Sequence, residues 1–306
     1  MSVFQLGRRS SQGQRIAVIG ATGFIGSATL RALAARGAAV TAIARQPPAQ
    51  PDAAKRWTQA DITDVDTLTT ALEGVDVVIH AGSYTGSDPN LCEVINHQGT
   101  RNVLLAADRS GIESVITLST IGVYGPGPFT GIVEDKREPN PITALSASRV
   151  AADHDVRAQG GTVVRPGFIH GPGDRWFTPG LWYILSQLGG WIDHGAPTQS
   201  TIEVDLLASQ LADLALTPTV GDRGALFHAS APEPSSVRSI AAATVGQGRD
   251  LPANNLTFPK ALRRAPDLGL TPRHIDLGGR DHTIDGTRLR KRLRGNAHEG
   301  SDPNSG

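Results

Sequence analysis

Cysteine, net charge and long apolar segments are all scarce in this chain. Cys92 is the only cysteine among 306 residues, so no disulfide can close within the chain, which fits the reducing cytoplasm. The 29 Lys and Arg residues balance the 29 Asp and Glu residues, so the composition gives no sign of binding to nucleic acid or to an anionic membrane. No apolar run approaches the roughly 18 residues of a membrane-spanning helix. We therefore expect a cytoplasmic protein that contacts neither nucleic acid nor membrane.

Signals and metal ligands are also missing from the sequence. Residues 1–14 are polar and basic and lack the apolar core of a secretory signal, so we expect a flexible tail there. Residues 288–306 are basic and then rich in Gly, Asn, Asp and Ser, which predicts a second flexible tail. The nine histidines show no metal-ligand spacing with Cys92 or with acidic residues, so no metal site is expected.

Between these tails, short apolar runs alternate with helical patterns. This alternation predicts an α/β fold, a doubly wound parallel sheet with helices on both faces. The pattern weakens after Pro172, which suggests a smaller C-terminal lobe or lid. We expect a main domain over 15–174, rejoined by 201–230, and a substrate-binding lobe over 175–200 and 231–287. The expected strands are 15–19, 38–43, 76–79, 114–118 and 161–165, and the expected helices are 27–36, 65–72, 94–107 and 149–158.

The first apolar run leads directly into a glycine-rich turn, Gly20-Ala-Thr-Gly23-Phe-Ile-Gly26. Gly20 permits the tight turn, Gly23 lets the backbone approach a pyrophosphate, and Gly26 lets strand and helix pack closely. The free N–H groups at the start of the following helix would hold the phosphate charge. Glycine-rich turns also occur for structural reasons, but this strand–turn–helix setting predicts a dinucleotide site of the Rossmann type.

The end of the second strand indicates which dinucleotide binds. A site that prefers NAD carries Asp or Glu about 20 residues after the glycine turn, to bind the ribose hydroxyls. This chain has Ala44 followed by Arg45, and a guanidinium can pair with a 2′-phosphate. The alternative for Arg45 is a solvated surface side chain. We therefore predict NADP(H) as the cofactor.

Further segments follow in the order and spacing of a known family. With the glycine turn, they make the chain resemble the extended short-chain dehydrogenases/reductases, relatives of sugar-nucleotide epimerases and dehydratases, over roughly residues 15–231. The segments are Asp61-Ile-Thr-Asp64, Val78-Ile-His-Ala-Gly82, Asn96-His-Gln-Gly-Thr-Arg-Asn102, Ser119-Thr-Ile-Gly-Val-Tyr-Gly125, Arg165-Pro-Gly-Phe-Ile-His-Gly-Pro-Gly-Asp174 and Glu203-Val-Asp-Leu-Leu207.

The resemblance implies specific roles for residues of this chain. Asp61 and Ile62 would meet the adenine, and the backbone of 166–169 would meet the nicotinamide amide. Asn96 would match the family's helix-bending asparagine, and Thr120 its active-site Ser or Thr. The helices beside the fourth strand often pair subunits in this family, so a homodimer could form. The implied cofactor contacts are Gly20, Thr22, Gly23, Phe24, Ile25, Gly26, Arg45, Asp61, Ile62, Ala81, Gly82, Pro166, Gly167, Phe168 and Ile169.

The chain departs from the family at the catalytic pair. Family members carry Tyr-x-x-x-Lys on one helical face, where the lysine lowers the pKa of the phenol so that it can exchange a proton with substrate. The corresponding segment here is Pro141-Ile-Thr-Ala-Leu-Ser-Ala-Ser-Arg149, so Leu145 replaces the tyrosine and Arg149 the lysine. None of the three tyrosines has a basic residue four positions later. The usual acid–base pair is absent.

This loss leaves two functions open. The protein could bind NADP(H) without catalysis, as a regulator or scaffold. Alternatively, hydride transfer persists and the proton comes from substrate or solvent, because general-acid help is worth about 10²- to 10⁴-fold and a reactive ketone hydrogen-bonded to its own phenol tolerates that loss. A sugar-nucleotide epimerase or dehydratase ranks third, since oxidising an unactivated alcohol needs the missing base most. We favour an NADPH-dependent ketoreductase for a polycyclic aromatic ketone, with Thr120 orienting the carbonyl.

Aromatic residues after Pro172 suit a flat substrate of this kind, although they could instead form a small hydrophobic core. Strand-end backbone bonding is the alternative for Thr120, and a structural role is the alternative for His170, which could also supply a proton. Ser83 and Tyr84 follow a strand end at which open α/β sheets bind ligands. The substrate-binding candidates are Ser83, Tyr84, Leu145, His170, Trp176, Phe177, Trp182 and Tyr183.

Overall fold

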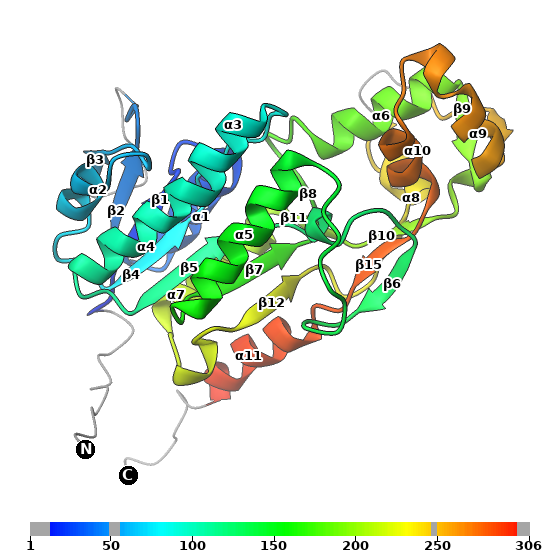
Figure 1. Ribbon diagram of the computed structural model, residues 1–306. Helices are drawn as coiled ribbons and strands as arrows, with labels where there is room; N and C mark the ends of the chain where they lie inside the picture. Colours follow the sequence, from blue (N-terminus) through cyan, green and yellow to red (C-terminus); the bar gives the residue numbers. More distant parts are fainter. Residues whose placement is uncertain (1–12, 49–55, 246–249, 299–306) are drawn as a thin grey trace, which may run out of the picture.

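A parallel seven-stranded sheet, in the order β12-β7-β5-β4-β1-β2-β3, forms the centre of the molecule (Figure 1). The structure is a computed structural model that describes residues 13–48, 56–245 and 250–298. The predicted α/β fold with a doubly wound parallel sheet is confirmed. The strands are β1 (Arg15–Ile19), β2 (Ala39–Ala44), β3 (Arg56–Gln59), β4 (Val77–His80), β5 (Ser114–Leu118), β7 (Thr162–Pro166) and β12 (Leu226–Ala229).

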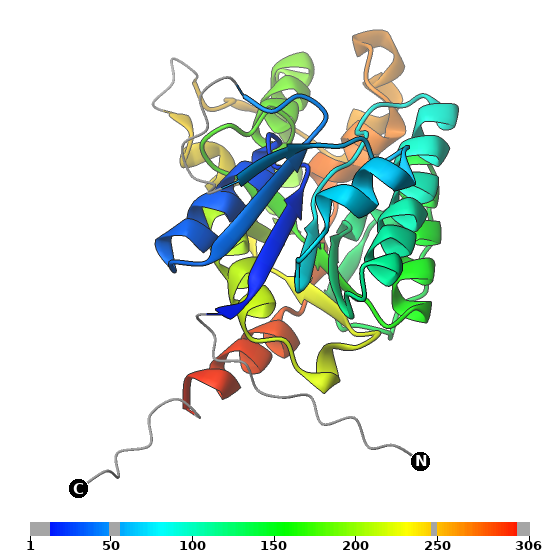
Figure 2. The ribbon, with the colours of Figure 1, turned by 90° about the vertical axis from the view of Figure 1, so that its left-hand side faces the viewer.

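Helices cover both faces of this sheet, which Figure 2 shows with one helical layer on each side. In β1, Ile16 and Val18 pack toward α1 and α7, whereas Ala17 and Ile19 pack toward the opposite layer. All four side chains are buried, which explains why the strand reads as a continuous apolar run. One layer holds α1 (Phe24–Ala35) and α7 (Val204–Leu216), and the other holds α2 (Val65–Ala71), α4 (Gly99–Arg109) and α5 (Ala144–Ala158).

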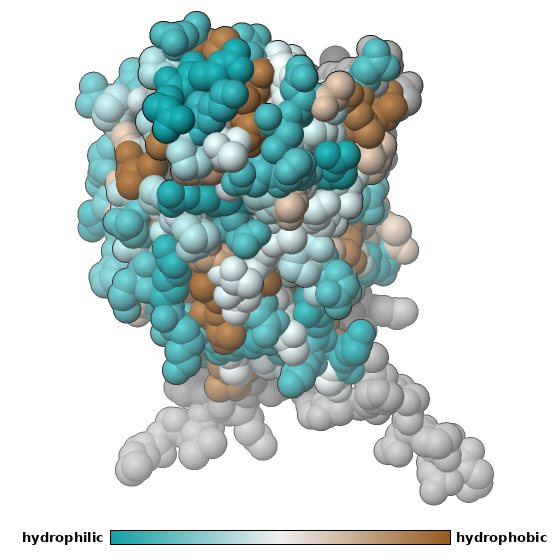
Figure 3. Space-filling model, turned by 90° about the vertical axis from the view of Figure 1, so that its right-hand side faces the viewer, coloured by the Kyte–Doolittle hydropathy of each residue, from teal (hydrophilic) through white to brown (hydrophobic). Residues whose placement is uncertain are grey.

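A smaller lobe with its own four-stranded sheet, in the order β13-β10-β15-β6, lies against the carboxyl-end side of the main sheet (Figure 1). Its outer face is mostly hydrophilic, with hydrophobic side chains in separate patches (Figure 3). The strands of this sheet are β6 (Phe129–Ile132), β10 (Thr198–Gln199), β13 (Ser235–Ser236) and β15 (His282–Ile284). Two further pairs join β8 (Phe168–His170) to β11 (Thr201–Glu203) and β9 (Gly190–Ile192) to β14 (Asn254–Leu256). The helices are α6 (Phe177–Leu188), α8 (Val237–Ala242), α9 (Phe258–Arg264) and α10 (Pro272–Gly279).

The chain crosses between these two parts more often than the sequence indicates. Residues 129–132 were expected in the main domain, but as β6 they pair with β15 of the lobe. A strand of four residues carries no signal of which sheet it joins when its partner lies about 150 residues away in the sequence. β12, which lies within the segment 201–230 that was expected to rejoin the main domain, pairs with β7 at the edge of the main sheet.

The expected C-terminal tail is wrong for residues 288–298, which form most of α11 (Thr287–His298). Leu289 is buried and Leu293 packs against the same core, so the basic segment has an apolar face that the composition hides. Arg292 donates to both carboxylate oxygens of Asp222, at 2.7 and 2.6 Å. The remainder of that tail, and residues 1–12 of the other, lie outside the described residues.

Three helices begin earlier than the sequence analysis expected, and one of them is α1, which begins at Phe24. α5 starts at Ala144 rather than at Arg149, because Thr143 and Ser146 form a capping box: each side chain accepts the other's backbone N–H, at 3.1 and 3.2 Å. The helix expected from Val94 is preceded by α3 (Pro89–Leu91) and a π-helical segment, Cys92–Gln98, before α4 begins. No helix in the described part of the chain is both long and apolar enough to span a membrane.

Candidate active site

The glycine turn after β1 depends on close backbone contacts. Gly20 has a φ of +81°, and a Cβ atom there would lie 2.5 Å from the backbone nitrogen of Gly82. At Gly26, a Cβ atom would collide with the carbonyl oxygen of Gly20. Larger residues are therefore excluded where β1, α1 and the loop after β4 meet. The sequence analysis assigned these two glycines the same conformational reasons.

The start of α1 leaves its amide groups available. Gly23 is the N-cap residue, no side chain caps the helix, and its first turn contains no acidic residue. The first N–H groups of a helix have no partner within it, so this end can hold an anion such as a phosphate. Thr22 and Gly23 are exposed, while Phe24 and Ile25 are half-buried. The geometry fits a pyrophosphate, and the cofactor contacts themselves stay a prediction.

Arg45, Asp61 and Ile62 follow the carboxyl ends of β2 and β3, at the sheet edge that also carries Gly20. Arg45 is exposed and makes no hydrogen bond, ion pair or ring contact with any residue that the structure describes. The Asp61 carboxylate accepts hydrogen bonds from the backbone N–H and the hydroxyl of Thr63, both at 2.9 Å. The carbonyl oxygen of Ile62 accepts one from Asn102 at 2.9 Å. These contacts fix the loop beside the expected adenine site.

Leu145 and Arg149 occupy the first two turns of α5. Leu145 is half-buried and carries no proton to exchange. Arg149 donates to the carbonyl oxygen of Leu118 at 3.0 Å and to the hydroxyl of Ser83, so its donors are directed at the protein itself. Burial lowers the pKa of the Arg149 guanidinium and Asp153 raises it, but an arginine remains a cation in proteins and is no general acid. The two positions lie on the same helix, as in the family, but the residues that occupy them cannot transfer a proton.

Asn96 holds the loop that follows β4. From the π-helical segment, its side-chain oxygen accepts from the Tyr84 N–H at 2.8 Å and from the Ser83 hydroxyl at 3.2 Å, while its amide donates to the Tyr84 carbonyl at 3.0 Å. A helix deviates from α geometry at this asparagine, as the resemblance implies. Ser83 and Tyr84 are thereby fixed beside Gly82 and Arg149. Their role as substrate contacts stays a prediction.

Thr120 stands at the end of β5 with its hydroxyl hydrogen free to donate. Its oxygen accepts the backbone N–H of Gly122 at 3.1 Å, and the hydroxyl makes no other bond in the described residues. Strand-end backbone bonding, the alternative reading, is therefore present, and it leaves one donor available for a carbonyl oxygen. A role in orienting that carbonyl stays a prediction.

The sequence analysis did not identify a buried ion pair that lies next to Ser119, the residue before Thr120. Asp153 of α5 accepts from the Ser119 hydroxyl at 2.8 Å and from Arg165 of β7 at 2.9 Å. The side chains of Asp153 and Arg165 are only 4% and 6% exposed. Arg165 also donates to the Tyr124 hydroxyl, 3.0 Å away. The one available signal was an arginine within an otherwise apolar strand, since charges rarely enter a core unpaired.

Residues 166–169, which were expected to meet the nicotinamide amide, contact residues of the lobe and of the segment that leads from it. Pro166 ends β7, and Gly167 lies so close to the Ser200 carbonyl oxygen that a Cβ atom would not fit. Phe168 stacks on Phe177 with ring centroids 4.8 Å apart. Ile169 and His170 continue β8, where His170 is half-buried and lies in register with Glu203. Whether these residues contact cofactor or substrate stays a prediction.

The aromatic cluster of α6 divides into buried and exposed members. Trp182 is buried in the core of the lobe and donates to the Thr244 hydroxyl at 2.7 Å. Phe177 is buried against Phe168, whereas Trp176 and Tyr183 are 65% and 45% exposed. The alternative of a small hydrophobic core thus describes the surroundings of Trp182, and the exposed pair is the more accessible to a ligand.

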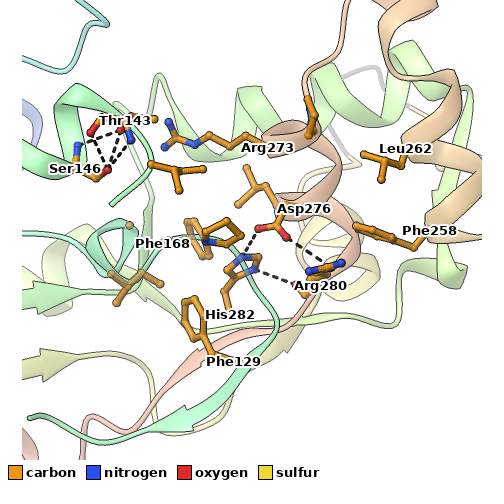
Figure 4. A pocket seen from close by; sticks show the side chains of 17 residues that line it. Phe129, Thr143, Ser146, Phe168, Phe258, Leu262, Arg273, Asp276, Arg280 and His282 are labelled. Carbon is orange, nitrogen blue, oxygen red and sulfur yellow. Dashed lines mark hydrogen bonds and ion pairs between the residues drawn. The ribbon is translucent and has the colours of Figure 1, made fainter. Parts of the chain in front are cut away.

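A cavity of about 310 Å³ separates the main domain from the lobe (Figure 4). Ile121 and Gly122, which follow Thr120, line this cavity. Thr143 and Ser146, on either side of Leu145, line it as well. From the main domain and adjoining β6 and β8 it is lined by Ile121, Gly122, Gly125, Pro126, Phe129, Ile142, Thr143, Ser146 and Phe168, and from the lobe by Phe258, Leu262, Pro272, Arg273, Asp276, Leu277, Arg280 and His282. The sequence analysis expected a substrate-binding lobe that includes residues 231–287, but it named none of these lobe residues, since no motif marks residues 258–282.

Asp276 organises the polar part of this cavity wall. It accepts the backbone N–H of Gly127 at 3.0 Å and lies 3.0 Å from Nε2 of His282. Burial opposes ionisation, but the hydrogen bonds from His282 and Gly127 lower the pKa of Asp276 below its ordinary value. Among the residues that the structure describes, no group of side chains has the arrangement of a metal site.

Comparisons with known proteins agree with this geometry. The sequence profile described as the NAD dependent epimerase/dehydratase family matches residues 16–179. The chain is 29% identical to a 4-hydroxy-2-methyl-3-oxo-4-farnesyl-3,4-dihydroquinoline-1-oxide ketoreductase of Stigmatella aurantiaca, over 83% of this chain and 79% of that protein. It is 30% identical to a 2-alkyl-3-oxoalkanoate reductase of Stenotrophomonas maltophilia, over 74% of this chain and 73% of that protein.

Solved structures share the fold. A dTDP-glucose 4,6-dehydratase from Streptomyces venezuelae, solved with NAD bound, superimposes with a TM-score of 0.70 at 21% identity, covering 96% of this chain and 93% of the other. At that identity the match shows a common architecture.

Proposed function

Since this chain belongs to the NAD dependent epimerase/dehydratase family, we propose that it is a nicotinamide-dependent oxidoreductase, specifically an NADPH-dependent ketoreductase. Its substrate in this proposal is a ketone on a polycyclic aromatic polyketide of the angucyclinone type, in antibiotic biosynthesis. The observation that carries the proposal is the contrast between the preserved glycine turn and the pair Leu145 and Arg149. The relatives named as ketoreductase and reductase support the same direction of reaction.

The cofactor half of the proposal rests on the sheet edge around Gly20. The uncapped start of α1 would bind the pyrophosphate, and the tight contact of Gly20 with Gly82 keeps side chains out of its path. Arg45, exposed and without a partner among the described residues, would pair with a 2′-phosphate. No acidic residue follows β2 to repel that phosphate, which favours NADPH over NADH.

The chemistry is divided between cofactor, protein and substrate. When bound, the reduced nicotinamide supplies the hydride. Thr120 would donate its free hydroxyl hydrogen to the carbonyl oxygen, holding the ketone in place and stabilising negative charge that develops there. Because neither Leu145 nor Arg149 can deliver a proton, the proton would come from a phenol on the substrate or from solvent.

The pattern of Leu145 with Arg149 resembles the angucyclinone ketoreductase of the simocyclinone pathway, and the apolar residues of the cavity wall support the same substrate class. Phe168, Phe258 and Leu262 give the cavity apolar surfaces against which an aromatic ring system can pack. A non-catalytic NADP(H)-binding regulator remains the competing proposal, favoured by the loss of the acid–base pair alone. An epimerase or dehydratase would need a base at position 145 to oxidise an alcohol.

Turnover separates these functions. The protein is incubated with NADPH and a series of aromatic ketones with and without a phenol adjacent to the carbonyl, and loss of the reduced-nicotinamide absorbance is followed. We expect the phenol-bearing ketones to be reduced faster, since these carry their own acid while the others depend on solvent for the proton. A protein that binds NADPH tightly but reduces none of them would instead be the non-catalytic regulator. Conversion of sugar nucleotides, tested in parallel, would favour the epimerase.

A further inference from the structure

Four ionisable side chains line the described walls of the cavity, and three of them are satisfied within the protein. Asp276 bonds to Gly127 and to His282, as above. Arg280 donates to the carbonyl oxygen of Gly127 at 2.6 Å, and its guanidinium lies 4.5 Å from the ring centroid of Phe258. These contacts join α10, β15 and the loop before β6, so they hold the cavity wall together.

Arg273 is the exception. From the first turn of α10, its guanidinium extends toward Thr143 and Ser146 at the start of α5, across the cavity (Figure 4). It makes no hydrogen bond, ion pair or ring contact with the described residues. Asp276 is the only carboxylate among the described residues that line the cavity, and it is already engaged. No carboxylate of the described cavity wall therefore pairs with Arg273, which is exposed to solvent.

The helix ends around Arg273 do not favour a positive charge there. Arg273 lies near the N-terminus of α10, where the helix dipole disfavours positive charge. The helix it faces, α5, also presents its N-terminus and has no acidic residue in its first turn. A guanidinium between two positive helix ends would be stabilised by an anion placed in the cavity beside it.

We propose that Arg273 is a specificity-determining residue that binds an ionised acid group, a carboxylate or an acidic phenol oxygen, on the aromatic substrate. The inference rests on the proposed function, because the acid group would mark the end of the ring system away from the carbonyl at Thr120. The paired donors of a guanidinium match the two oxygens of a carboxylate. The cavity would thus select an acid-bearing aromatic ketone over a neutral ketone of the same shape.

Two probes of nearly equal shape test this selection: anthraquinone-2-carboxylate and anthraquinone-2-carboxamide. Their affinities for the NADP⁺-saturated protein are measured by calorimetry at low ionic strength. We expect the wild-type protein to bind the carboxylate about 10-fold more tightly, in line with a charge-assisted hydrogen-bonded pair. Arg273→Gln should remove this preference and leave the carboxamide affinity unchanged. Arg263→Gln, at an exposed arginine of α9 outside the cavity, is the matched control and should keep the preference.

Three results would overturn the inference: equal affinity of the wild type for both probes, binding of neither probe, or a preference that survives Arg273→Gln. Turnover distinguishes this failure from failure of the proposed function. If no ketone is reduced but Arg273→Gln abolishes the carboxylate preference, the acid site stands and the reductase proposal fails. If ketones are reduced but Arg273→Gln raises KM equally for acidic and neutral ones, the acid site alone fails.

Discussion

The glycine turn at residues 20–26 and the first two turns of α5 contact the same loop after β4, but by different means. Gly20 meets Gly82 through backbone atoms that leave no room for a side chain. Arg149 meets Ser83 through a side chain. The contact at Gly20 is possible only with glycine. In α5, by contrast, the helix is retained while the family's tyrosine and lysine are replaced by Leu145 and Arg149. In the proposed function, cofactor binding depends on backbone geometry and proton transfer on side-chain identity, so one can be lost without the other.

The largest effect is expected from adding one carbon atom to the backbone contact. Gly20→Ala should destabilise the protein by about 3 kcal/mol, from the left-handed conformation plus the collision with Gly82, and should weaken NADPH binding by about 100-fold. Gly37→Ala is the matched control, because Gly37 has a similar φ of +70° but nothing within 4 Å of a new Cβ atom. Urea unfolding and cofactor titration measure both. Equal losses for the two variants would mean that strain, not close approach, makes glycine necessary at position 20.

The main sheet buries two histidines, His80 of β4 and His228 of β12, and their burial predicts a pH dependence of stability. Burial lowers the pKa of His80 to about 4, with a further contribution from Arg149, and burial with Arg165 lowers that of His228 to about 4, against 6.5 when unfolded. Below pH 6.5 these histidines are protonated in the unfolded chain but stay neutral in the folded protein. The free energy of unfolding therefore falls as the pH drops toward 4, and below that pH this contribution levels off.

Between pH 7 and 5 we expect a loss of about 2 kcal/mol per histidine in the free energy of unfolding. His80→Gln and His228→Gln should each remove about half of this pH dependence, while His154→Gln, at a histidine whose side chain is 81% exposed, should leave it unchanged. Urea titrations across the pH range test the point. A pH dependence unaltered in both buried variants would contradict the assignment.

The preference for NADPH over NADH tests the one side chain, Arg45, that is proposed to bind the cofactor beside the glycine turn. Arg45→Ala should weaken NADPH binding by about 10- to 100-fold and leave NADH binding nearly unchanged, because only NADPH carries the 2′-phosphate. Fluorescence titration with each reduced cofactor gives the ratio. Equal weakening of both cofactors would refute a phosphate-binding role for Arg45.

The smallest effect is expected where the family pattern is partly restored. Leu145→Tyr should raise the ketone reduction rate by less than about 3-fold, because Arg149 bonds to Leu118 and Ser83 and no lysine lowers the pKa of the new phenol. The double change Leu145→Tyr with Arg149→Lys is the sharper comparison. A gain of about 100-fold in kcat from the single change would show that the wild-type reaction is limited by a missing acid.

Much of the main domain was predictable because its signals are local. The apolar run of β1, the glycine turn and the acid-free end of β2 each reflect contacts within about 30 residues, and the Rossmann arrangement makes such contacts regular. The absent pair at Leu145 and Arg149 was also readable, since one helix holds both positions. The early start of α5 was missed because a Thr143–Ser146 cap resembles ordinary loop sequence.

The lobe was not predictable in the same way. β6 finds its partner β15 about 150 residues later, and Asp276, Arg280 and His282 meet Gly127 only through that pairing. Asp153 and Arg165 likewise could not be interpreted from the sequence, because their salt bridge forms only when α5 packs on β7. Side chains that act through distant partners leave no periodic or motif signal.

By itself, then, the sequence determined the strand–turn–helix cradle and the absence of the Tyr and Lys pair, because each depends on residues close in the chain. Only the tertiary structure decided that a cavity lies between Thr120 and α10, and that Arg273 enters it without a partner among the described residues. The reason is that burial and charge pairing arise from the assembled fold, where residues far apart in sequence set one another's surroundings.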